Sequence, residues 1–186
     1  MTTKMSGFKI QATVDPCFTD DEMDLLIKAA ETEMFTGRVD GKVTDPEIRR
    51  AQVHGLDKKK YDWVYVKVWK AILEANKNYY GFSIKHLEGK IQISRYHEDD
   101  NGHYTWHMDV GAHAAERKLS LSIQLSQPSD YEGGRIGFFY SRNEVYASRD
   151  RGAIITFPSW VMHHVTPVTK GVRYSLVAWV TGPRWK

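Results

Sequence analysis

The chain has one cysteine, no long apolar run and little excess of either charge, and each of these shortages excludes a class of protein. Cys17 has no second cysteine with which to form an internal disulfide, so a disulfide-stabilised secreted domain is excluded. No stretch approaches the roughly 18 apolar residues of a membrane-spanning helix, and residues 1–9 lack the apolar core of a signal peptide. The net charge of +3 is thin support for a nucleic-acid partner. We therefore expect a cytoplasmic protein with no membrane partner, and we disfavour nucleic acid.

The chain does have the size and composition of one globular domain. It contains 186 residues, of which 41% are hydrophobic and 26% are charged, and these fractions are close to the globular average. A chain of this length buries about 70% of its unfolded surface, so it needs no structural metal to fold. No repeat or interdomain linker is visible. We expect a single domain over 1–186, with helical support in 1–85 and a strand-rich core in 86–186.

Two helices are predicted in the first half. Thr19–Glu22 is a capping box, in which a Thr at the N-cap and a Glu three residues later satisfy free backbone N–H groups, and apolar residues follow at helical spacing up to Met34. The segment 59–79 has no Pro or Gly and predicts the second helix, which Gly81 can end. The glycine-containing, charged segment 36–57 between them predicts a long loop with one short strand, and long loops often act as lids.

The second half is dominated by period-two patterns, which predict strands with polar turns between them. Residues 119–125 alternate throughout, with four aliphatic residues on one face and Ser120, Ser122 and Gln124 on the other. A polar row is costly in a dry core, but less so if it faces water or lines a cavity that holds a polar ligand. Short antiparallel strands of this kind predict a mainly β sandwich or barrel with N-terminal helices. The predicted strands are 90–96, 119–125, 136–140, 152–157 and 173–180.

Two histidine-containing segments are candidate metal ligands. In an extended strand His107 and Asp109 point the same way, so an imidazole nitrogen and a carboxylate oxygen can converge on one cation. The pair is a weak signal alone and also fits a surface pair. The second segment holds His163 and His164, which equally fit a polar strand end or one core histidine. Two imidazoles and one carboxylate would leave one face of a metal open, which suits non-haem Fe(II).

Arg173 is a candidate anion-binding residue. Period two puts Arg173 and Ser175 on the same face of a predicted strand. A guanidinium pointing into a barrel is a costly buried charge unless an anion meets it, and arginine suits bidentate binding of a carboxylate. The alternative is an arginine at the barrel rim that pairs with an acid of this chain. An organic dicarboxylate could chelate iron at one end and reach Arg173 with the other.

The order of these residues resembles that of the Fe(II)/2-oxoglutarate-dependent dioxygenases, most closely the small bacterial and phage members of the prolyl 4-hydroxylase-like branch. The resemblance covers roughly residues 45 to 182 and extends beyond the isolated motifs. A long phrase carries most of it, running from His163 through Val165, Pro167 and Gly171 to Arg173 and Ser175. The other supporting phrases are IQISRY at 91–96, YTWHMD at 104–109, YEGG at 131–134 and FPS at 157–159.

The resemblance implies a double-stranded β-helix, a cupin-like jelly roll, with helices packed on one sheet and iron near its open end. It implies that His107, Asp109 and His163 are the metal ligands; His163 is preferred to His164 because the family's distal histidine stands two residues before a Val and four before a Pro. It further implies that Arg173 binds the distal carboxylate of 2-oxoglutarate. Tyr96 and Ser175 are expected to add hydrogen bonds to this cosubstrate.

The activity that the resemblance implies is hydroxylation of a C–H bond, coupled to oxidative decarboxylation of 2-oxoglutarate. The expected cofactors are Fe(II), 2-oxoglutarate and O2, with ascorbate as a further candidate. The preferred substrate is a peptidyl proline in a peptide or protein. The alternatives are a free amino acid, dealkylation of nucleic acid by the same superfamily, and a non-catalytic cupin-like binding protein. The segment after Asp109 lacks the family's Arg-x-Asp and has Arg117-Lys118 instead, so the substrate stays open. A phage-encoded member would act in the host cytoplasm.

Overall fold

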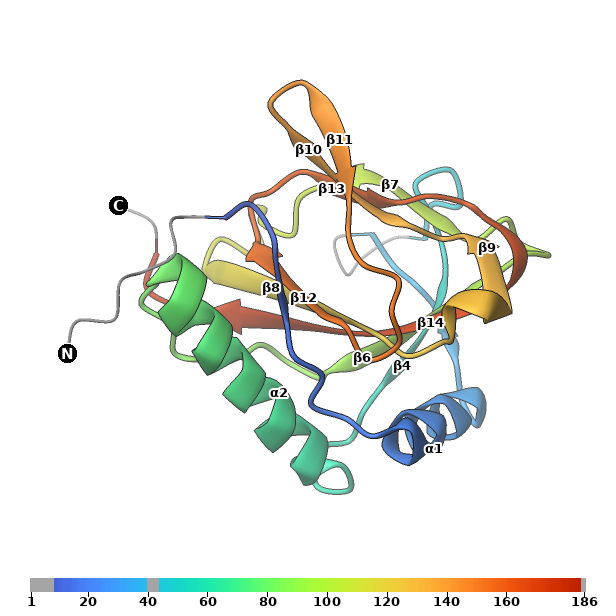
Figure 1. The fold of residues 1–186 in the computed structure, drawn as a ribbon, viewed down its shortest axis with the longest axis horizontal. Coiled ribbons are helices and arrows are strands. Elements are labelled where there is room, and N and C mark those ends of the chain that lie inside the picture. The colour runs from blue at the N-terminus through green and yellow to red at the C-terminus, as the bar shows by residue number, and fades with distance from the viewer. Residues whose placement is uncertain (1–8, 40–43, 185–186) are drawn as a thin grey trace.

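Two antiparallel β-sheets lie face to face in the structure, a computed structural model that describes residues 9–39 and 44–184 (Figure 1). Within these residues the smaller sheet has the order β11 (Asn143–Tyr146), β10 (Ile136–Tyr140), β13 (His163–Val165), β7 (His103–His107) and β3 (Arg49–Arg50). The larger sheet has the order β1 (Ala12–Val14), β12 (Ile154–Pro158), β8 (Arg117–Gln124), β14 (Val168–Thr181), β6 (Gln92–His97), β4 (Gln52–Gly55) and β2 (Phe35–Thr36), and β5 (His86–Leu87) and β9 (Tyr131–Gly133) also pair with β14. A short 3₁₀ turn, η2 (Pro128–Asp130), precedes β9.

This arrangement confirms the predicted mainly β jelly roll. The strand β14 pairs with both β6 and β8, and so joins the two halves of the larger sheet. The strand β13 pairs with β7 in the smaller sheet and aligns His163 with His107. Apolar side chains between the two sheets form a core cluster that includes Phe138, Phe157 and Val168. The sheets are thus held together by burial on their inner faces, and this burial brings β7 and β13 over β8 and β14.

The helix α1 (Asp20–Glu31) begins at the predicted capping box. The Thr19 hydroxyl accepts the backbone N–H of Glu22, and the Glu22 carboxylate accepts the backbone N–H of Thr19. Such a cap contributes about 1 kcal/mol to stability. The buried face of α1 packs into the same core cluster as the outer face of the larger sheet, which the helices cover in Figure 1.

The helix α2 (Asp62–Ala75) begins three residues later than the sequence predicts. The Asp57 carboxylate accepts the backbone N–H groups of Lys59 and Lys60 and holds them in a turn instead. The helix continues as a π-helical turn, η1 (Asn76–Tyr80), and ends as predicted at Gly81, whose φ of 67° is left-handed. Within the part of the chain that the structure describes, no helix combines the length and apolarity that crossing a membrane requires.

The strand β8 has two buried faces of different character. Leu119, Leu121 and Ile123 point into the cluster shared with the helices, where burial of each side chain contributes about 1.5–3 kcal/mol. The alternating residues from Ser120 to Gln124 are also buried, but they lie on the face between the sheets. The polar row that the sequence shows is therefore inside the barrel, where it needs polar partners.

The segment 36–57 is more structured than predicted, although residues 40–43 lie outside the described residues. Instead of a loop with one short strand, it contributes β3 to the smaller sheet and β4 to the larger one. Both strands are short, and they form because they pair with β7 and β6. Pairing with strands distant in sequence leaves no local pattern from which these strands could be predicted. The sheets also use β1 and β2, so strands from both sides of residue 86 build the fold. The prediction of a single domain over 1–186 stays a prediction.

Candidate metal and dicarboxylate site

Three potential metal ligands meet between the two sheets. His107 is the last residue of β7, His163 is the first residue of β13, and one ligand atom from each, with a carboxylate oxygen of Asp109, lies within 4.8 Å of the others. The Asp109 carboxylate is 3.9 Å from His107 Nε2 and 3.6 Å from His163 Nε2. The strand ends at His107, so the assumption that Asp109 lies in the same strand is wrong. Asp109 sits in a bend, and its backbone N–H donates to the Ser159 carbonyl at 2.9 Å.

Both imidazoles present the nitrogen that a metal would need. His107 Nδ1 lies 2.7 Å from the Thr105 carbonyl, and His163 Nδ1 lies 2.9 Å from the Val161 carbonyl. Because a carbonyl only accepts, each Nδ1 carries the hydrogen and each Nε2 keeps a lone pair facing Asp109. Burial, with the nearby His163, lowers the pKa of His107 and favours its neutral form. Neutral imidazoles are the form that binds a metal.

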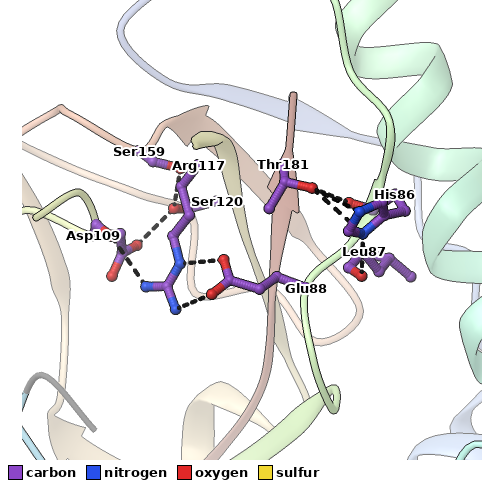
Figure 2. A network of polar contacts seen from close by, with 8 residues as sticks. All are labelled: His86, Leu87, Glu88, Asp109, Arg117, Ser120, Ser159 and Thr181. Carbon is purple, nitrogen blue, oxygen red and sulfur yellow. Dashed lines mark hydrogen bonds and ion pairs between the residues drawn. The ribbon is translucent and has the colours of Figure 1, made fainter. Parts of the chain in front are cut away.

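The Asp109 carboxylate and backbone are held by separate partners (Figure 2). Ser120 Oγ donates to Asp109 Oδ2 at 2.6 Å and lies 3.0 Å from Ser159 Oγ. Arg117 Nη1 donates to the Asp109 carbonyl at 3.0 Å. Glu88 accepts from Arg117 Nε at 2.7 Å and from Nη2 at 3.2 Å. Hydrogen bonds of this kind orient a ligand before a metal arrives.

This donor set fits an Fe(II) ion. Two neutral imidazole nitrogens and one carboxylate bind one side of a divalent ion and leave positions open for other molecules. His164 is not part of the set. Its Nε2 is hydrogen-bonded to Glu144 Oε1, and its ring stacks on Trp106 with centroids 3.9 Å apart.

Arg173 is buried in the same cavity with an incomplete set of partners. Its side chain is 1% exposed, and Nε and Nη2 donate to Gln124 Oε1 at 3.2 and 2.9 Å. Its Nη1 is buried without a hydrogen-bond partner, and no described acid pairs with the guanidinium. The described residues therefore do not support the alternative of a rim arginine paired with an acid of this chain. A buried cation of this kind requires an anion.

Other polar groups around Arg173 point to the same requirement. The hydroxyls of Ser94 and Ser122 are buried and have no hydrogen-bond partner. The Tyr96 ring lies 5.4 Å from the guanidinium carbon, and Ser175 is 1% exposed. All four of these residues line the same cavity as Arg173. These donors fit one carboxylate of 2-oxoglutarate better than they fit an empty apolar core.

One cavity of about 1140 Å³ holds both the three potential metal ligands and Arg173. Its apolar lining includes Ile136, Phe157 and Val165. The volume exceeds that of a typical small-ligand pocket, which is about 300–1,000 Å³, so it can hold a dicarboxylate and part of a second molecule. The sequence signalled Ser122 through the polar row, but nothing in it pointed to Ser159, to Arg117 as a partner of Asp109, or to the unpaired hydroxyl of Ser94.

Known sequences that are similar to this chain are oxygenases and hydroxylases. Residues 91–181 match the family model described as the 2OG-Fe(II) oxygenase superfamily. A PKHD-type hydroxylase from Idiomarina loihiensis is 33% identical over 92 residues, which cover 49% of this chain and 41% of that protein. A PKHD-type hydroxylase from Maricaulis maris is 29% identical over 148 residues, which cover 77% and 66%. Other PKHD-type hydroxylases are matched over a smaller share of their length, and one from Synechococcus is matched over 28% of its length. The chain therefore spans well under two thirds of the length of these relatives.

Comparison with solved structures agrees on the fold. A prolyl-4-hydroxylase from Pseudomonas putida superposes with a TM-score of 0.76 at 19% identity, covering 92% of each chain. A prolyl hydroxylase from Trichoplax adhaerens, solved with a peptide fragment of hypoxia inducible factor, superposes with a TM-score of 0.77 at 16% identity, covering 93% of this chain and 84% of that one. The family match covers just under half of the chain, and the fold is that of solved prolyl hydroxylases, so both comparisons point to the 2OG-Fe(II) oxygenase superfamily.

Proposed function

We propose that the protein is an Fe(II)- and 2-oxoglutarate-dependent hydroxylase that acts on a peptidyl proline. The observation that supports the activity most strongly is the shared cavity of His107, Asp109 and His163 with Arg173, whose buried Nη1 has no partner. The peptide substrate is supported by the likeness in fold to prolyl hydroxylases, one of which was solved with a peptide. The cavity volume beyond what 2-oxoglutarate needs is consistent with a substrate side chain.

The chain's residues divide into two groups in this proposal. His107, Asp109 and His163 hold the iron, with the two Nδ1–H groups fixed by backbone carbonyls so that each Nε2 faces the metal. Ser120 keeps one carboxylate oxygen of Asp109 engaged and so leaves the other free to bind. Because these contacts already exist within the chain, little reorganisation accompanies metal binding.

The second group binds the cosubstrate. Arg173 receives the distal carboxylate of 2-oxoglutarate, and Gln124 fixes the guanidinium by accepting from Nε and Nη2. Tyr96 and Ser175 add hydrogen bonds from the walls of the cavity. When bound, the iron and 2-oxoglutarate supply the oxidising power for C–H hydroxylation with O2. The protein orients the two and keeps water out with apolar lining residues such as Phe157.

The experiment supplies purified protein with Fe(II), 2-oxoglutarate and air, and measures succinate with and without a mixture of proline-containing peptides. We expect succinate formation that depends on Fe(II), stops when Zn(II) replaces it, and rises with peptide, together with the addition of one oxygen atom to a peptide. Parallel samples with and without ascorbate test whether a reductant is required. Absence of Fe(II)-dependent succinate would refute the activity, and succinate with peptides left unmodified would refute the peptidyl proline.

A further inference from the structure

The described lining of the cavity carries more positive than negative charge. Its charged side chains other than histidine are Arg38, Arg49, Arg117 and Arg173 against Glu88 and Asp109. Fe(II) and the 2-oxoglutarate dianion cancel one another, so loading the site does not change this balance. Arg117 is neutralised by Glu88, and Arg173 and Asp109 belong to the cosubstrate and metal sites. Two positive charges, those of Arg38 and Arg49, therefore stay without an anion among the described residues.

Arg49 lies close to the proposed iron. It sits in β3, opposite Tyr104 of β7. Its guanidinium carbon lies 4.8 Å from the centre of the Tyr104 ring, and that ring stacks on His107 with centroids 3.5 Å apart. Only one aromatic ring separates this cation from a proposed metal ligand, so Arg49 borders the part of the cavity where a substrate must approach.

The guanidinium of Arg49 is held in position but only partly hydrogen-bonded. A Cβ at Gly37 would lie 2.9 Å from Arg49 Nε, so the Gly37 backbone packs against the guanidinium, while Tyr104 covers one face. Nη1 donates to the Arg38 carbonyl at 3.0 Å, and Nε is buried without a partner. Within the described chain, Nη2 has no hydrogen bond and the group forms no ion pair. With no acid beside it among the described residues, the half-buried guanidinium can still bind an anion in the cavity.

We propose that Arg49 is a specificity-determining residue that binds a carboxylate of the substrate. The protein then selects a peptide with Asp or Glu close to the hydroxylated residue over an otherwise identical neutral or basic peptide. This inference rests on the proposed function, because it concerns the substrate of the same cavity. The α-carboxylate of a free amino acid has the same chemistry, and the experiment below distinguishes the two sources.

The test uses three mixtures of synthetic peptides with a central proline, identical except that one position within three residues of it holds Glu, Gln or Lys. Mass spectrometry measures oxygen incorporation when the mixtures compete. A charge-assisted contact corresponds to roughly 10- to 150-fold in affinity, so we expect the Glu mixture to be preferred to the Gln mixture by about that factor. Free L-proline against L-prolinamide forms the second arm.

Three variants assign the preference to one residue. Arg49→Gln should bring the Glu-to-Gln ratio close to one, and Arg49→Lys should keep part of it. Lys70→Gln removes the same charge from an exposed position of α2 and should keep the whole preference. Because the ratio is measured within one protein, a general loss of activity does not affect it.

Equal oxygenation of the Glu and Gln mixtures, with no preference for proline over prolinamide, would overturn the proposal. A Glu preference that persists in Arg49→Gln would overturn the assignment to Arg49. If wild-type protein forms succinate from 2-oxoglutarate but oxygenates neither peptide nor free proline, the carboxylate substrate is refuted and the dioxygenase chemistry stands. If it forms no succinate, the proposed function fails, and this inference fails with it.

Discussion

The hydrogen bond from Ser120 to Asp109 offers a sharp test of how the metal site is organised. Ser120 is 1% exposed and donates to Asp109 Oδ2 at 2.6 Å. In Ser120→Ala the carboxylate loses this bond, and because the position is buried, bulk water does not replace it. A hydrogen bond to a charged group is worth about 1.5–3 kcal/mol, and loss of such support weakens metal binding by roughly 10- to 100-fold.

The assay is a titration of apo protein with Mn(II), followed by electron paramagnetic resonance under nitrogen without 2-oxoglutarate. The matched control is Ser122→Ala, two residues along the same face of β8, whose hydroxyl is buried without a partner. We expect the control to bind Mn(II) within about twofold of wild type, in line with substitutions that remove no contact. Wild-type affinity in Ser120→Ala would refute the orienting role. An equal loss in both variants would indicate damage to β8 instead.

Three further predictions concern the proposed ligands, the cosubstrate and the segment before the barrel. Arg173→Ala should weaken 2-oxoglutarate binding roughly 10- to 150-fold by calorimetry with Mn(II) under nitrogen, and Arg173→Lys should weaken it less because the charge remains; unchanged affinity would mean that another cation binds the cosubstrate. His163→Ala should abolish metal-dependent decarboxylation of 2-oxoglutarate and His164→Ala should retain it, and the reverse result would exchange their roles. The segment 36–57 is predicted from sequence to act as a lid, but β3 and β4 pair with β7 and β6, so limited proteolysis should spare both strands even without substrate; cleavage in either strand that slows when substrate binds would instead support a lid.

The features that the sequence predicted well are those with a local cause. The capping box at Thr19 requires only residues three apart, and the structure contains both of its hydrogen bonds. The alternation over 119–125 reflects the pleat of one strand, and it correctly placed Ser120 and Gln124 on one face. The spacing from His163 to Arg173 reflects a turn and one strand. In each case the information lies within a few residues.

The features that the sequence did not predict depend on distant partners. Arg117 is positioned by Glu88, 29 residues earlier, and only that pairing aims it at the Asp109 carbonyl. The strand β3 has two residues and exists because β7 lies beside it. Asp109 leaves the strand because its N–H bonds to Ser159, which lies beyond β12. No local period encodes such contacts, so the candidate site could be named from sequence but its supporting network could not.

The two faces of β8 have different roles, because one contributes to folding stability and the other lines the ligand-binding cavity. Leu119, Leu121 and Ile123 contribute to the cluster beneath the helices, while Ser120 and Ser122 reach only the cavity. Substitutions at the odd-numbered positions should therefore lower the melting temperature before they alter ligand binding. Substitutions at Ser122 can change what the cavity accepts while the larger core stays intact, whereas Ser120 and Gln124 already support Asp109 and Arg173. In directed evolution toward a new substrate, such a position allows ligand binding to change without a loss of folding stability.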